Sequence, residues 1–244
     1  MKKYFTLLLF LLSIFLTASA QPAEQYTVAS TTATLRSGQG KEFDIVATLS
    51  KNEIVRVLKV NDNGWWHVDY NGKDGFIVSQ FLKKRSNEGW IPTQYESGDT
   101  PQCDNVKPEY DLKLDNHLKV TVNSKTDVVL KLMRSEKAGD VCIRTVYIES
   151  NDFLLIKNIP EGKYYLKLAY GTDWRQKNIN GKCQGRFTEN ARYEIGEERL
   201  NYKIVQFSTK VDIPSYSLSL GMKAREGIEA TFNSNQISEV EFNK

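Results

Sequence analysis

Histidine and cysteine are scarce in this chain of 244 residues, and their scarcity narrows the chemistry open to it. His67 and His117 are the only histidines, and each falls in a strand-like stretch, where partial exposure on a strand is the expected role. The sequence contains no C-x-x-C pair and no H-E-x-x-H motif, so the common zinc-binding spacings are missing. We therefore expect a protein that is not an enzyme and that holds no cofactor and no metal.

An excess of charge of one sign is also missing. Lys and Arg together number 33 and Asp and Glu 30, a formal net charge of +3. No polybasic stretch is present, so the electrostatic case for binding nucleic acid or an anionic membrane surface fails. The segment Gly38–Lys41 has the glycines and lysine of a phosphate loop, but it lacks the earlier Gly and the following Ser or Thr. We expect a surface turn there.

One long apolar run is present, and it lies at the start of the chain. Lys2 and Lys3 precede the run Phe5 to Leu16, and Ala18-Ser19-Ala20 supplies small residues for cleavage. The run is short of the ~20 residues that a spanning helix needs. The pattern predicts a cleaved signal peptide over residues 1–20 and export to the periplasm or beyond the cell, with no membrane span after cleavage.

The rest of the chain has the composition of strands and turns. Short stretches rich in β-branched and aromatic residues alternate with Gly, Asn, Asp and Pro, and no stretch shows a sustained helical period. The sequence predicts an all-β protein, in which a small β-barrel (24–84) precedes a linker (85–111) and a larger antiparallel β-sandwich (112–244). Trp90 interrupts the polar linker and is a candidate to pack it against a domain.

The three cysteines, Cys103, Cys142 and Cys183, allow one internal disulfide. Export leads to an oxidising compartment where thiols tend to pair. We expect a Cys142–Cys183 bond because both residues fall in the predicted sandwich, and closing a loop of ~40 residues would add about 3–4 kcal/mol. Cys103, in the linker, would then be left for a bond to another chain.

The predicted barrel carries a series of motifs in a recognisable order. Asn71-Gly72 between two apolar runs is the strongest hairpin signal in the chain. The other matching motifs are Leu35-Arg36-Ser37-Gly38, Val55-Arg56-Val57, Asn63-Gly64-Trp65-Trp66-His67-Val68-Asp69-Tyr70, Gly75-Phe76-Ile77 and Phe81-Leu82. Together they resemble the bacterial SH3 domain family over about a quarter of the chain. The resemblance implies a small, partly open barrel that serves as a targeting or binding module, often for peptidoglycan or its peptide stems.

The same motifs point to candidate ligand-binding residues. The segment is also similar to eukaryotic SH3 domains, but Val78 stands where their groove has proline and Phe81 where it has tyrosine, which argues against P-x-x-P ligands. Trp65, Val78 and Phe81 would instead form an apolar shelf for a sugar or peptide. If Trp65 is buried packing, Trp66 becomes the exposed ring, since neighbours alternate on a strand. The candidate set is Trp65, Trp66, Tyr70, Val78 and Phe81.

The predicted sandwich has a weaker family signal. Ile159-Pro160-Glu161-Gly162-Lys163-Tyr164-Tyr165-Leu166 is similar to a strand of carboxypeptidase-regulatory and prealbumin-like sandwiches, which implies a scaffold without catalytic residues. We expect strand 118–122 to pair with strand 128–133 or with one nearby, and 240–242 to form the last strand. Trp174 is expected to cap one end of the sandwich, the alternative being a place on a ligand-binding loop.

Two functional hypotheses follow. In the first, the chain is an exported, non-catalytic cell-envelope protein whose barrel binds peptidoglycan or a wall-linked peptide. In the alternative, it is an adaptor or assembly component that binds envelope proteins through its β domains. Both leave the oligomeric state open.

Overall fold

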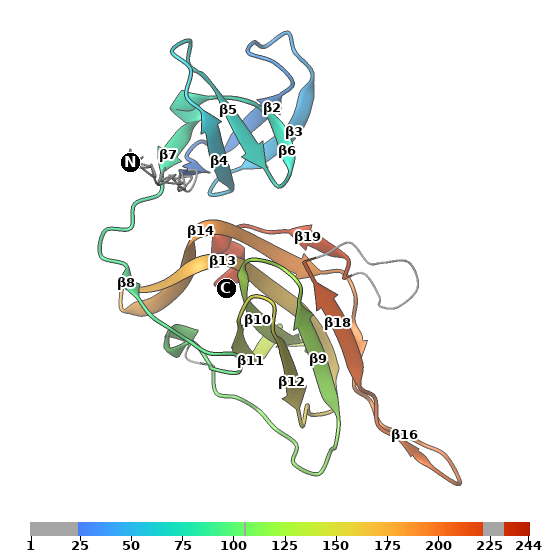
Figure 1. Cartoon of the computed structure of the whole chain (residues 1–244). Helices are drawn as coiled ribbons and strands as arrows, with labels where there is room; N and C mark the ends of the chain where they lie inside the picture. Colours follow the sequence, from blue (N-terminus) through green and yellow to red (C-terminus); the bar gives the residue numbers. More distant parts are fainter. Residues whose placement is uncertain (1–23, 105, 222–231) are drawn as a thin grey trace, which may run out of the picture.

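The computed structural model describes residues 24–104, 106–221 and 232–244, and nearly all of its regular structure is β-strand (Figure 1). The described residues include one α-helix, the short α1 (Glu239–Phe242). The predicted all-β class is confirmed. The predicted signal peptide, residues 1–20, lies outside the described residues. Of the helices in the described part of the chain, none has the length and apolar character that crossing a membrane requires.

The first seven strands form one antiparallel sheet that curls into a small barrel (Figure 1). Its sheet order is β3-β2-β6-β5-β4-β1-β7. Asn71 and Gly72 join β5 to β6 with φ angles of 58° and 76°, which is the backbone that a tight hairpin requires. Alternate residues point inward, and Leu35, Val68 and Ile77 are fully buried in the barrel core. The elements are β1 (Gln25–Val28), β2 (Thr32–Arg36), β3 (Ile45–Ser50), β4 (Ile54–Lys59), β5 (Trp65–Tyr70), β6 (Lys73–Val78), the 3₁₀ turn η1 (Ser79–Phe81) and β7 (Leu82–Lys84).

Two further sheets form the sandwich. The larger has the order β11-β10-β13-β14-β19, with β8 and β15 also paired to β13, and the smaller has the order β12-β9-β18. Leu166, Leu168 and the rings of Tyr164 and Tyr170 all lie in the core between them, as the alternation of this segment predicts. The strands are β8 (Ile91–Pro92), β9 (His117–Val122), β10 (Asp127–Arg134), β11 (Val141–Ile148), β12 (Phe153–Lys157), β13 (Lys163–Ile179), β14 (Lys182–Gly196), β15 (Leu200–Asn201), β18 (Tyr216–Leu220) and β19 (Ser234–Gln236).

Of the two partners expected for strand 118–122, the structure has the nearby one, β12, and one further pairing departs from the antiparallel expectation. Strand β9 does not pair with β10, because the chain crosses from the smaller to the larger sheet in the turn between them. Their inward residues, such as Val120 and Leu130, meet across the core instead. Strand β18 runs parallel to β9, so the sandwich is not wholly antiparallel.

The segment 240–242, predicted as a strand, belongs to helix α1. The Ser238 side chain accepts a hydrogen bond of 3.1 Å from the backbone N–H of Glu241, which is the geometry of a helix N-cap. Phe242 is 1% exposed and packs against Tyr193, with ring centroids 5.4 Å apart. The buried ring therefore anchors one helical turn, where the run of apolar and acidic residues had suggested a strand.

The hairpin of β13 and β14 is longer than the sequence indicates, and it lies on the side of the sandwich that faces the barrel (Figure 1). Trp174 lies within β13, not in a loop. Its ring is 5% exposed and packs edge-on against Phe187 at 4.9 Å. Ile54 of β4 belongs to the same buried cluster. Trp174 therefore contributes to packing beneath the barrel.

The predicted linker, 85–111, lies against the sandwich. Trp90 is 8% exposed, and the guanidinium of Arg186 stacks over its ring at 3.9 Å. Strand β8 then pairs with β13, and the backbone N–H of Tyr147 donates a hydrogen bond of 2.8 Å to the carbonyl oxygen of Asp99. Trp90 therefore packs the linker against the sandwich, as its place in the polar stretch predicts, and backbone pairing holds the neighbouring residues.

The disulfide joins Cys103 to Cys183, so the predicted Cys142–Cys183 pairing is wrong. Cys103 lies in the 3₁₀ turn η2 (Gln102–Asp104), which packs on β14, and its Cα is 4.8 Å from that of Cys183. That distance suits a disulfide. Cys142, on β11, is outside this bond, and its Sγ lies 3.4 Å from the carbonyl oxygen of Arg144. The prediction fails because the linker is ordered here: η2 packs on β14 and holds Cys103 beside Cys183.

Candidate functional site

The candidate residues of the barrel lie on two strands, β5 and β6, and on η1. Pairing across the hairpin places Trp65 directly opposite Val78. Alternation then sends Trp66, Val68 and Tyr70 to one face and Trp65 with His67 to the other. Val68 is fully buried and Tyr70 is 9% exposed, so the face of Trp66 is the barrel interior. Trp65 and Val78 lie on the outer face.

Three of the five predicted residues contribute to packing. Trp66 packs against the barrel core and makes an edge-on contact with Tyr26 at 5.2 Å, and Phe81 packs against the same core from η1. Burial raises the pKa of the Tyr70 phenol far above its usual value, and the nearby Glu53 adds to this. The five residues therefore do not share one face, and only Trp65 and Val78 form an outward pair.

Two residues that the sequence did not single out extend this pair. The imidazole of His67 stacks on the ring of Phe76, with centroids 4.9 Å apart and planes 23° apart, and it also bonds the carboxylate of Asp74. His67 and Phe76 are directly opposite on β5 and β6, next to Trp65 and Val78 on the same face. We call these four residues, Trp65, His67, Phe76 and Val78, the outer ledge. Both residues could be identified from the sequence by taking every second residue from Trp65 along β5 and its opposite neighbour on β6 across the Asn71-Gly72 turn.

The backbone of Trp65 is fixed by the loop that precedes it. Asn63 accepts a 3.1 Å hydrogen bond from its N–H, and the Asn61 side-chain amide donates to its carbonyl at 2.8 Å. The side chain of Asn63 also donates to Gln39, which links this loop to the loop between β2 and β3. The two loops and the start of β5 therefore meet at the Trp65 end of the ledge.

The ledge is suited to binding by stacking. A half-buried indole beside a stacked imidazole and phenyl ring gives a rigid apolar surface at little entropic cost. Polar groups at its border, including the Asp74 carboxylate and the asparagines of the preceding loop, supply hydrogen bonds. Such a surface fits the face of a sugar ring or an extended peptide. Among the described residues, no group of three or more His, Cys, Asp or Glu is arranged to hold a metal ion.

Comparison with known proteins locates a family in this part of the chain. Residues 31–83 match the family described as the bacterial SH3 domain. The SH3 and PX domain-containing protein 2B of Homo sapiens and that of Mus musculus are each 39% identical to the chain over 44 residues. The match covers 18% of this chain and 5% of each relative, so the chain spans a small part of the length of these relatives. The resemblance read from the barrel motifs is confirmed, while that of the sandwich stays a prediction.

Proposed function

Because residues 31–83 form a bacterial SH3 domain, we propose that the chain is an exported, non-catalytic cell-envelope protein whose barrel binds peptidoglycan or a wall-linked peptide. Domains of this family are typically cell-wall binding. The outer ledge, above all the outward pair of Trp65 and Val78, is the observation that carries the proposal. The Cys103–Cys183 disulfide fits an oxidising compartment outside the cytoplasm.

Co-sedimentation with purified sacculi tests this proposal. The wild-type chain is expected to pellet with sacculi at moderate salt, and Trp65→Ala to stay largely in the supernatant. Phe153→Ala is the matched control, because Phe153 is another accessible ring, 56% exposed, but lies on the sandwich. Failure of the wild type to pellet, or equal loss in both variants, would overturn the proposal.

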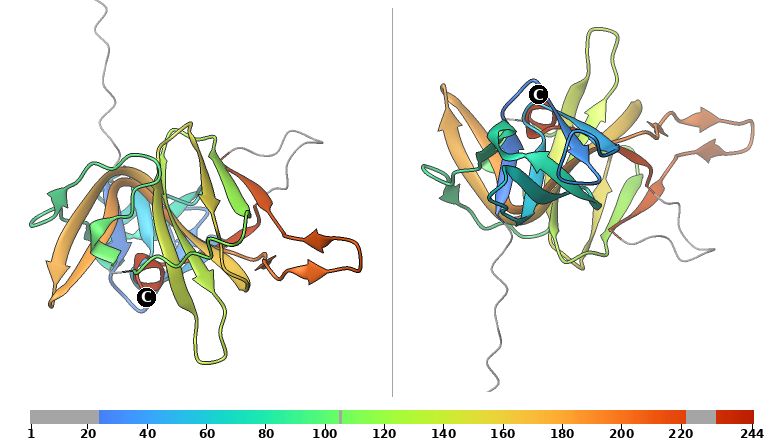
Figure 2. Two further views of the ribbon diagram at one scale, coloured as in Figure 1. Left: turned by 90° about the horizontal axis from the view of Figure 1, so that it is seen from below. Right: turned by 90° about the horizontal axis from the view of Figure 1, so that it is seen from above.

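A second candidate function, the adaptor role, rests on a different feature. The hairpin of β16 (Val205–Gln206) and β17 (Val211–Asp212) projects from the body of the sandwich in both views of Figure 2. It exposes four apolar side chains, namely Val205, Phe207, Val211 and Ile213. Accessible apolar groups on a projecting hairpin are typical of protein contacts.

The adaptor role predicts that crosslinking in intact cells captures an envelope protein through this hairpin. A Phe207→Ser, Val211→Ser double variant should lose that crosslink while its sacculus binding is unchanged. Recovery of the same crosslink from the double variant would exclude the hairpin as the contact.

A further inference from the structure

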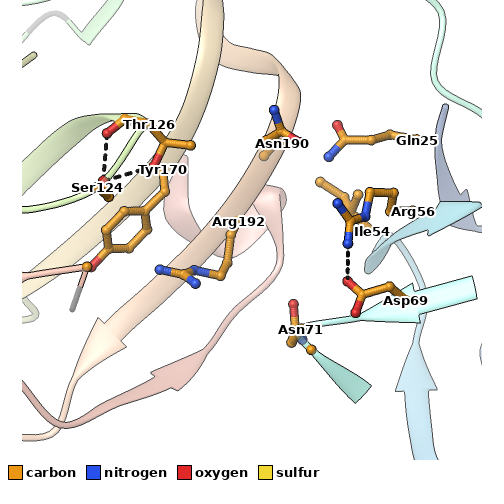
Figure 3. A pocket seen from close by; sticks show the side chains of 13 residues that line it. Gln25, Ile54, Arg56, Asp69, Asn71, Ser124, Thr126, Tyr170, Asn190 and Arg192 are labelled. Atoms are coloured by element: carbon orange, nitrogen blue, oxygen red, sulfur yellow. Dashed lines mark hydrogen bonds and ion pairs between the residues drawn. The ribbon is translucent and has the colours of Figure 1, made fainter. Parts of the chain in front are cut away.

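A cavity of about 380 Å³ lies between the barrel and the sandwich (Figure 3). Its volume is in the range of small-molecule sites. Both bodies contribute polar side chains to its lining, which includes Arg56, Asp69, Asn71, Tyr170, Asn190 and Arg192. The residues of the outer ledge are not among those that line it. The cavity lies further along β5 than the ledge, and its lining residue Asp69 is two residues, about 7 Å, beyond His67 of the ledge.

The two walls of the cavity are held in place by buried contacts. The side chain of Arg85, 4% exposed, donates to the Gln25 side chain at 2.6 Å and pairs with Glu239 of α1. Ile54 inserts from the barrel into the buried cluster that contains Phe187 of β14. The ion pair of the buried Arg85 with Glu239 and the apolar contact of Ile54 therefore fix the barrel on the sandwich, and they hold the two walls of the cavity in place.

A β-bulge shapes the sandwich wall. The ladder of β13 and β14 shifts register where Gly171 lies opposite two residues, Asn190 and Ala191, and both of these line the cavity. A Cβ atom at position 171 would lie 2.3 Å from the Cβ of Phe187, so the position requires glycine. Bulges of this kind redirect side chains, and they are common beside functional sites.

One arginine lies on each wall, and its acidic partner contacts only one nitrogen of the guanidinium. The guanidinium of Arg192 stacks over the Tyr170 ring at 4.3 Å, and its Nε lies 2.9 Å from Glu194. Across the cavity, Nη2 of Arg56 lies 3.6 Å from Asp69. Both arginine side chains are 44% exposed. A guanidinium carries five N–H donors, and each of these ion pairs occupies one nitrogen, so both arginines retain donors for a ligand.

We propose that this interdomain cavity binds a small ligand that carries a carboxylate. Arginine is the side chain best suited to a carboxylate, because its parallel N–H groups match the two oxygens. Figure 3 shows Arg56 and Arg192 on facing walls, with Asn190 and Asn71 above and below the gap in this view. The amides and the hydroxyls of Ser124 and Thr126 would bond the neutral part of the ligand. Peptide ends and acidic amino sugars share this chemistry.

The test measures binding of paired probes to the full chain by saturation-transfer NMR. For a peptide source the pair is N-acetyl-alanyl-alanine and its C-terminal amide. For a sugar source the pair is N-acetylmuramic acid and N-acetylglucosamine, which lacks the carboxylate. At least one carboxylate probe is expected to bind. Its neutral counterpart should have an affinity at least about tenfold lower. Absence of binding by both carboxylate probes, or equal binding within each pair, would overturn the proposal.

Variants then locate the site. Arg192→Gln and, on the opposite wall, Arg56→Gln should each weaken the carboxylate probe about tenfold. The control is Arg199→Gln, because Arg199 also stacks over a tyrosine, Tyr165, at 4.6 Å, but does not line the cavity. Melting curves verify folding, and Arg56→Gln serves alone if Arg192→Gln is unfolded. An equal effect of Arg199→Gln contradicts the assignment.

This inference stands apart from the proposed wall binding. Trp65→Ala should bind the carboxylate probe like the wild type, whereas the two cavity variants should still pellet with sacculi. Sacculus binding without binding of either carboxylate probe would refute the cavity site alone. Binding of a carboxylate probe without sacculus binding would refute the ledge alone.

Discussion

At the scale of single residues, the neighbours Trp65 and Trp66 show how one strand separates binding from packing. Period-two alternation requires one ring inside and one outside, and the sequence predicts that contrast. Which ring faces outward depends on the residues that follow. Polar His67 and Asp69 share the face of Trp65, whereas Val68 shares the face of Trp66. The adjacent aromatic residues obscure this parity, because either ring alone would suit the core.

The different environments of the two rings predict different costs of removing them. Trp66→Ala should lower the free energy of unfolding by about 2–3 kcal/mol, because a core-packed ring is lost. Trp65→Ala should cost less than about 1 kcal/mol. Urea unfolding followed by circular dichroism measures both values. Equal losses of stability, or a larger loss for Trp65→Ala, would contradict the assignment of Trp66 to the barrel core.

Tyr165 gives a prediction for alkaline pH. Its hydroxyl donates to Asp140 at 2.8 Å, and burial, with Asp140 adding to it, raises the pKa of the phenol to about 12 from the ordinary value of 10.0. Between these pH values the unfolded chain loses this proton before the folded chain does. Stability should therefore fall as pH rises from about 10 to about 12, by up to about 1.4 kcal/mol per pH unit from this group.

Comparison with Tyr165→Phe isolates this contribution. The variant loses one hydrogen bond at neutral pH, but its stability should fall less steeply than that of the wild type over the same alkaline range. Urea midpoints at several pH values provide the measurement. Parallel pH profiles for the two proteins would contradict the raised pKa.

At the scale of elements, regular alternation is predictable and interruptions of it are not. The face shared by Tyr164, Leu166, Leu168 and Tyr170 follows directly from the sequence, because strict alternation admits one arrangement. The continuation of β13 beyond Gly171 does not, since Gly171-Thr172-Asp173 has the composition of a turn. Only the contact with β14 makes it a bulge inside a long strand. The same holds for the linker, whose order depends on partners distant in sequence.

The disulfide tests this account of the linker. Peptide mapping of the oxidised protein should recover Cys103 joined to Cys183. The bond spans 80 residues, so its reduction should lower the free energy of unfolding by about 4–5 kcal/mol in the chain-entropy model. Cys142→Ser is the control and should leave the bond intact. A Cys142–Cys183 peptide, or no change on reduction, would contradict the arrangement of the linker.

At the scale of the whole molecule, the placement of the barrel depends on a cluster that brings together distant parts of the chain. Arg85 follows the last barrel strand, Glu239 begins α1, and the Nη2 of Arg186 in β14 donates to the carbonyl oxygen of Ser86 at 2.6 Å. Local patterns carry no sign of such a cluster, because its members are separated by about 50 to 150 residues. The cavity residues could not be grouped from the sequence for the same reason.

Removing the cluster should loosen the barrel. Arg85→Ala leaves the partly buried Glu239 with only the more distant Arg186, 3.9 Å away, and should cost about 2–3 kcal/mol. Calorimetry should show separate melting of barrel and sandwich where the wild type melts in one transition. The neighbouring Lys84→Ala removes an exposed pair with Glu24 and should leave the melting profile nearly unchanged. A single unshifted transition for Arg85→Ala would show that the cluster does not couple the two bodies.

The most direct test of the central claim, that the outer ledge binds a wall ligand, uses the four tryptophans as reporters. Each indole N–H gives its own NMR signal, and soluble peptidoglycan fragments are titrated into the labelled full chain. The Trp65 signal is predicted to shift in a saturable manner, while those of Trp90, buried along the linker, and Trp174, buried beneath the barrel, stay in place. Four unmoved signals, or shifts confined to Trp90 and Trp174, would contradict the claim.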